Sequence, residues 1–144
     1  MGTKSVREII ESALRAQLVA QTELTGVNVY KGLEVAVDAL PAIVVSCESV
    51  GSPPDLNDNL GNFLCTVNVA IYSSADESTA LSVHRDRQAA TMGAMQDVSG
   101  IKSLFTSQGD ATCYDVTFTG LEDGRGDRSL GTMLSYSVLI VLPA

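Results

Sequence analysis

Apolar residues recur every three or four positions near the start of the chain, a spacing typical of a helix that packs one face against a core. The stripe consists of Val6, Ile9, Ile10, Ala13, Leu14 and Leu18. It predicts a helix over residues 3–23. Ser5 and Glu8 have the spacing of a capping box, with Thr3 as a second candidate cap, and Gly26 follows the predicted end.

A second helical pattern covers residues 77–98. Leu81, Met92 and Met95 form the stripe that we expect to be buried. The residues that follow, 101–105, are interpreted as a short strand or a turn.

Elsewhere the apolar residues alternate with polar ones or form short β-branched runs, as in strands. The predicted strands are a short one within 27–40, then 42–49, 62–73, 112–119 and 130–142. Two polar segments, 51–61 and 120–129, are predicted to be loops, the second of them the loop of a hairpin. The predicted fold class is therefore α+β, an antiparallel β-sheet of about four to five strands with two helices packed on one face, in one domain over residues 1–144.

The net charge of the chain limits the kinds of molecule that we expect it to bind. Its 144 residues include 9 basic and 17 acidic ones, which give a net charge of −8 and argue against a general electrostatic grip on nucleic acid. Residues 32–84 contain acidic residues but neither Lys nor Arg. This imbalance predicts a negative surface that meets a basic partner, lines a passage through which DNA must slide, or is simply solvated. The longest apolar runs, such as 138–142, are far shorter than the roughly 20 residues of a membrane span.

The residues that often carry chemistry form no recognisable constellation. Cys47, Cys65 and Cys113 are odd in number and lack metal-ligand spacing, so we expect reduced, buried thiols. His84 is the lone histidine, with no nucleophile or phosphate-binding motif, and is interpreted as a half-buried helix residue or an interface residue. We therefore expect no enzyme, with no catalytic, cofactor-binding or metal-binding residue. The start of the chain lacks a signal peptide, so we expect a protein that is intracellular where it is made.

The last strand is apolar on both faces, although one face of a two-layer domain meets water. Met133, Leu139 and Val141 lie on one face and Leu134 and Ile140 on the other. The strand 62–73 repeats the pattern on its more mixed face. A protein that works alone rarely leaves so much apolar area uncovered, so we expect a homo-oligomer. The alternative is a third layer formed by residues 27–40.

The order and texture of these segments resemble a known family. An amphipathic first helix precedes a Leu-Pro-Ala-Ile-Val-Val strand entry at 40–45, a loop rich in Pro and Asp, and a helix containing His84 and Met95. The chain closes with Thr-Met-Leu-Ser-Tyr-Ser-Val at 132–138. Over most of its length this is similar to the tail terminator proteins of tailed bacteriophages, and more loosely to other small neck and head–tail joining proteins.

The resemblance implies a ring of six α+β subunits that caps the tail tube, ends its polymerisation and offers the surface that docks the filled head. The implied partners are further copies of the chain, the tail tube protein and the head–tail connector or neck proteins. DNA is implied only as cargo passing through the lumen, and no membrane is involved. The implied location is the tail or neck of the virion, assembled in the host cytoplasm.

The two predicted loops and the last strand supply the candidate contacts with neighbouring subunits or the tube, chosen by position. These candidates are Pro53, Asp55, Asp58, Glu122, Asp123, Arg125, Asp127, Arg128, Met133 and Leu139. Arg125 and Asp127 belong to an Arg-Gly-Asp tripeptide whose match to the integrin motif we attribute to chance. The alternatives to a tail terminator are a head-completion stopper, a tail tube subunit or a small ligand-binding module, with an enzyme last.

Overall fold

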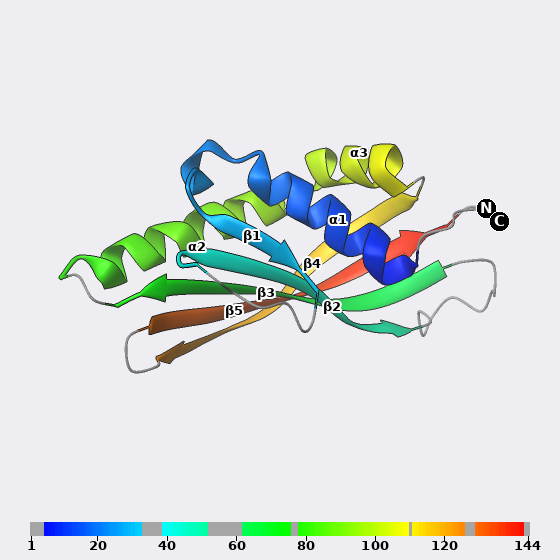
Figure 1. Ribbon diagram of the computed structural model, residues 1–144. Coiled ribbons are helices and arrows are strands. Elements are labelled where there is room, and N and C mark those ends of the chain that lie inside the picture. Colours follow the sequence, from blue (N-terminus) through cyan, green and yellow to red (C-terminus); the bar gives the residue numbers. More distant parts are fainter. Residues whose placement is uncertain are drawn as a thin grey trace.

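A computed structural model describes residues 5–32, 39–51, 62–75, 78–109, 111–125 and 129–142. Three helices lie on one side of a five-stranded sheet (Figure 1), so the predicted α+β class is confirmed. The elements are α1 (Val6–Val19), the 3-10 turn η1 (Thr22–Leu24), β1 (Asn28–Lys31), β2 (Ala42–Gly51), β3 (Asn62–Ser74), α2 (Ala80–Gln96), α3 (Val98–Gly109), β4 (Thr112–Arg125) and β5 (Ser129–Val141).

The strands lie in the order β1-β2-β3-β5-β4. Pairing is antiparallel from β2 to β4, as the hairpin-like links predict. The pair β1–β2 is parallel, which corrects the expectation of a wholly antiparallel sheet. Parallel neighbours need a connection that returns the chain to the same end of the sheet, and residues 32–41 provide it. Residues 28–31 therefore extend the sheet edge and do not form a third layer.

The segment interpreted as a short strand or turn is instead part of a third helix, α3. Ile101 and Phe105 lie four positions apart and are both fully buried, as on the inner face of a helix. Asp97 separates this helix from α2, and its carboxylate accepts a hydrogen bond from the backbone N–H of Gly100 at 3.1 Å. That bond satisfies one of the free N–H groups at a helix start, which explains why the chain begins a new helix there.

The segment predicted as a ten-residue hairpin loop is mostly strand. β4 runs on to Arg125, and Glu122 pairs with Met133 across the ladder to β5. The three glycines in this segment were the reason for expecting a loop. Only residues 126–128 separate the two strands, and they lie outside the described residues. Glu122 and Asp123 are thus held on a strand and not at a loop tip.

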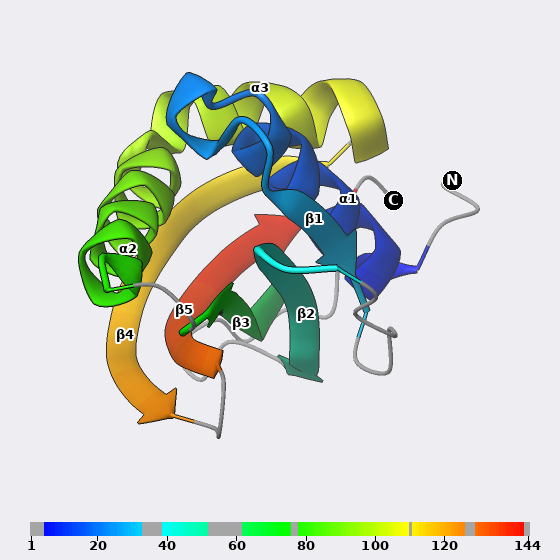
Figure 2. The ribbon, with the colours of Figure 1, turned by 60° about the vertical axis from the view of Figure 1, so that its left-hand side comes forward.

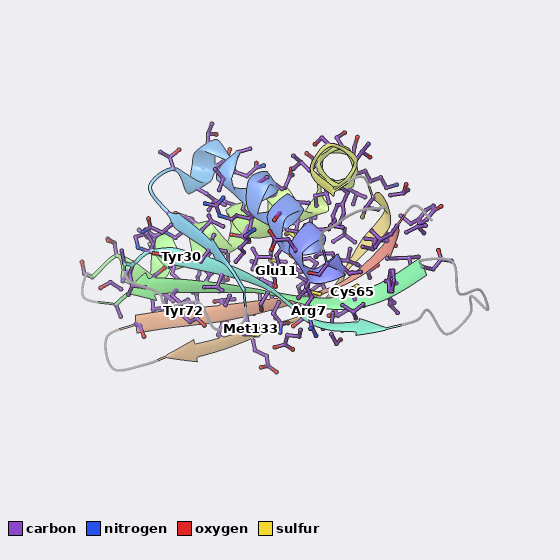
Figure 3. The ribbon with its side chains drawn as sticks, turned by 45° about the vertical axis from the view of Figure 1, so that its right-hand side comes forward. Arg7, Glu11, Tyr30, Cys65, Tyr72 and Met133 are labelled. Atoms are coloured by element: carbon purple, nitrogen blue, oxygen red, sulfur yellow. The ribbon has the colours of Figure 1, made fainter. Side chains whose placement is uncertain are left out.

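The first helix begins and packs as its sequence pattern predicts. Ser5 is the N-cap, and its hydroxyl accepts a hydrogen bond from the Glu8 N–H at 3.1 Å. The buried apolar stripe is supplemented by two charged side chains that hold β2, visible where α1 meets the sheet in Figure 3. Glu11 accepts from the Cys47 N–H at 2.8 Å and Arg7 donates to the Cys47 carbonyl at 3.1 Å. These bonds satisfy backbone groups at a register shift in β2.

Different helices pack against different strands of the sheet. Figure 2 shows α3 beside β4 and α1 beside β1 and β2, in agreement with the contacts between these elements. The three cysteines lie in the core as free thiols, as expected. Burial raises the pKa of Cys113 to about 11, which keeps that thiol protonated at neutral pH.

Candidate functional site

No described helix or loop covers the sheet face opposite the helices, which we call the free face (Figure 1). Side chains of β2, β3 and β5 that alternate with core residues point to it, and cross-strand partners share it. They include Val44, Ser46, Ser49, Asn62, Leu64, Thr66, Asn68, Ala70, Tyr72, Met133, Ser135, Ser137, Leu139 and Val141. The free face is therefore a mixture of apolar and hydroxyl-bearing side chains.

The apolar residues expected to need a covering partner are less exposed than the sequence suggests. Met133 is 37% exposed, while Leu139 and Val141 are half-buried and Ala70 is buried. The polar positions satisfy one another, as where the Ser135 hydroxyl donates to the Asn68 side-chain oxygen at 3.0 Å. Among the described side chains of the free face, Met133 is the large apolar one that is exposed.

Met133 borders a hollow of about 270 Å³ in the free face, which we call the glycine hollow. Its lining is Ala70, Tyr72, Glu122, Asp123, Gly124, Gly131, Thr132 and Met133. Gly124 pairs with Gly131 across β4 and β5, so two neighbouring positions carry no side chain. The hollow lies in the space that these two glycines leave open. Figure 3 shows Tyr72 and Met133 on this side of the sheet, away from the helices.

The structure brings together three of the ten candidate contact residues. Glu122, Asp123 and Met133 line the glycine hollow. Leu139 lies on the free face further along β5, and Arg125 ends β4. The remaining candidates lie outside the described residues: Pro53, Asp55, Asp58, Asp127 and Arg128. Of the acidic residues in 32–84, Glu48 lies within the described part of the chain.

A chain of hydrogen bonds lies on the other face of the same end of the sheet, under α2. Arg87 Nη1 donates to Ser73 Oγ at 2.8 Å, and Ser73 Oγ lies 2.7 Å from His84 Nδ1. His84 Nε2 lies 2.8 Å from Thr132 Oγ1, which donates to Asp123 Oδ1 at 2.7 Å. A guanidinium only donates and a carboxylate only accepts, so the chain runs from Arg87 to Asp123 and places the proton of His84 on Nε2.

This polar chain fastens α2 to three strands. Gln88 reinforces it, because its amide nitrogen donates both to Asp123 at 2.8 Å and to Thr132 Oγ1. His84 is 2% exposed, more buried than its sequence position suggests. Burial lowers the pKa of His84 below its usual value, Asp123 opposes that shift and Arg87 adds to it. The imidazole is thus neutral at pH 7.

The serine beside the histidine is equally inaccessible. Ser73 is 1% exposed, and its hydroxyl lies between the guanidinium of Arg87 and the imidazole of His84. Both partners are satisfied inside the fold, and every buried side-chain nitrogen or oxygen in the described part of the chain has a partner. The geometry therefore serves to position α2. No sequence signal pointed to it, because Ser73 and Thr132 lie 11 and 48 residues from His84.

A cavity of about 290 Å³ opens between α2 and the ends of β4 and β5. Leu81, Arg85 and Gln88 of α2 border it, with Leu130 opposite. Leu81 was expected in the buried stripe of its helix, but it is 47% exposed. The reason is its place in the first turn of α2, which lies at the edge of the molecule in Figure 1.

Within the ranges that the structure describes, no group of three or more His, Cys, Asp or Glu side chains is arranged to hold a metal ion. No described helix is both long enough and apolar enough to cross a membrane.

Comparisons with known proteins find a similar fold in a solved structure but no match in sequence. No protein-family model matches the chain, and no curated protein matches it in sequence. A solved structure described as the virion of a native gene transfer agent particle contains a chain with the same fold. The TM-score is 0.65 at 14% identity, over 91% of this chain and 93% of that one. The fold is one that a virion uses. At this identity the likeness shows the architecture alone.

Proposed function

We propose that this protein is a structural component of a phage-like virion. The observation that carries the proposal is the shared fold with a chain of the gene transfer agent virion over nearly the full length of both chains. A match of that extent relates whole subunits and not an isolated supersecondary motif. The resemblance of the element order to tail terminators supports the same class of protein.

Within that class, we propose the role of tail terminator. Six copies form a ring on the end of the tail tube, stop its polymerisation and offer the surface that docks the head. Support comes from the uncovered free face, where Met133 and the glycine hollow suit contact with another subunit. The net charge of −8 suits a lumen through which DNA passes without adhering.

We further propose that the role is not enzymatic. The lone histidine and its serine neighbour are both buried, and each is committed to a partner that holds α2 on the sheet. A nucleophile and its base need access to a substrate, which these positions lack. Substituting His84 should therefore lower the stability of the fold, and no catalytic activity should be lost with it.

Negative-stain electron microscopy of the purified protein, alone and mixed with growing tail tubes, tests the proposal. We expect rings several times the mass of the 15.1 kDa chain and tubes that carry a ring at one end and stop growing. A protein that stays single and leaves tube growth unchanged contradicts the tail-terminator role. Open cylinders built from this protein alone indicate a tube subunit instead.

A further inference from the structure

We propose that Leu81 and Arg85 of one copy insert into the glycine hollow of the next copy, with Arg85 pairing with Glu122. The inference rests on the proposed ring, since it names the contact that builds it. The partner is thus a second copy of this chain, bound through the first turns of α2.

The hollow sets two requirements for whatever fills it. Its walls include the ring of Tyr72 and the thioether of Met133, which favour an apolar side chain. Its lining also includes the exposed carboxylate of Glu122, which has no hydrogen bond or ion pair within the described ranges. An apolar group beside a cation meets both requirements.

The start of α2 presents such a pair. Leu81 is 47% exposed and Arg85 is exposed one turn later, so the two side chains share a face of the helix. Arg85 makes no hydrogen bond or ion pair with any other described residue. Its guanidinium is therefore available to a carboxylate outside its own subunit, and it suits a bidentate pair.

Three other exposed apolar groups, on β4 and α2, fit the hollow less well. Phe118 and Leu121 lie on β4, the strand that also carries Asp115, Glu122 and Asp123, so bringing them to an acidic hollow would oppose like charges. On α2, Val83 shares a face with Arg87, but that guanidinium is committed to Ser73.

The positions of the two patches favour a closed ring. The first turns of α2 lie on the helix side of the sheet and the hollow lies on the free face, so the contact joins unlike surfaces. Such heterologous contacts build rings when the rotation between copies closes. Figure 1 shows the start of α2, the end of β4 and the start of β5 at the same end of the molecule, which suits copies arranged around an axis beyond that end. Further surface must join the interface, because a stable one buries about 800 Å² per partner.

Charge reversal with complementation tests the contact. Arg85→Glu alone and Glu122→Arg alone each place like charges together at every contact, so each should need about a hundredfold higher concentration to assemble. An equimolar mixture should assemble like the unmodified protein. In an alternating ring, Glu at position 85 faces Arg at position 122, and the next contact is the native pair.

Matched controls make the same charge changes elsewhere. Lys102→Glu and Glu23→Arg alter exposed residues away from both patches and should assemble normally in sedimentation velocity. Urea unfolding should show that all four variants fold. Single variants that assemble normally, or a mixture that fails to recover, would overturn the contact while leaving the ring intact. An unmodified protein that never assembles would overturn both this contact and the proposed function.

Discussion

The helices α1 and α2 pack on the same sheet but differ in how much of the packing is apolar. The buried residues of α1 are mostly apolar, whereas two of the four buried residues of α2, His84 and Thr91, are polar. Apolar burial is non-directional and independent of protonation, while the bonds through His84 need one tautomer and one orientation. The difference teaches that the orientation of α2 depends on specific polar bonds, whereas α1 closes the apolar core.

The largest effect should follow a cavity under α1. Leu14 is fully buried, so Leu14→Ala should lower the free energy of unfolding by about 3 kcal/mol in urea titration. The matched change in the first turn of α2, Leu81→Ala, should alter it by no more than about 0.5 kcal/mol, because that side chain is 47% exposed and lies outside the core. Equal losses for the two variants would contradict the difference between the helices.

A smaller loss should follow a break in the polar chain. Thr132→Val keeps the shape of the side chain but removes the hydroxyl between His84 and Asp123, which leaves the buried N–H of the His84 imidazole without its acceptor. The expected cost is about 1–3 kcal/mol of unfolding free energy. Thr132→Ser keeps the hydroxyl and should recover most of it. A valine variant as stable as the serine variant would show that the chain does not hold α2.

Acid should loosen α2 before α1. The pKa of His84 is lowered in the folded protein, so on acidification the unfolded chain takes up its proton first, near pH 6.5. Stability is therefore present above that pH and is lost as the pH falls towards the folded-state pKa. Between pH 7 and pH 5.5, hydrogen-exchange protection factors, which correct for the slower intrinsic exchange at lower pH, should fall in α2 and not in α1. His84 is the only histidine of the sequence. The variant His84→Asn should therefore lose the part of the fall in unfolding free energy between pH 7 and pH 5.5 that comes from imidazole protonation.

The smallest effect concerns the start of α1. Ser5→Ala removes the hydroxyl that caps the Glu8 N–H and should cost about 1 kcal/mol. Ser5→Asp should keep the cap and the stability, as measured by thermal unfolding. Equal stability of the alanine and aspartate variants would mean that α1 gains nothing from its cap.

The same contrast explains what the sequence could predict. The first helix was predictable down to its cap, because Ser5, Glu8 and the apolar stripe are local signals. The strands 62–73 and 130–142 were predictable from alternation, with boundaries within about a residue of β3 and β5. Helix α3 was missed because Gly100, a residue typical of helix ends, lies just before Ile101, and part of β4 was missed because its glycines suggested a loop.

The candidate contact surface was only partly predictable. Met133, Glu122 and Asp123 were chosen by position, and the structure gathers them at one hollow. The hollow itself depends on the register that sets Gly124 opposite Gly131, which no local pattern reveals. The polar chain joins residues far apart in sequence for the same reason. Cross-strand and helix–sheet proximity is a property of the folded chain, so sequence spacing alone cannot disclose it.

The central claim is that copies of this chain cover one another's free face. Sedimentation velocity of the unmodified protein over a wide range of concentrations tests it most directly. We predict one closed species several times heavier than the 15.1 kDa chain, with a mass that stops rising as the concentration increases. A stable single-chain species at the highest concentration would contradict the claim.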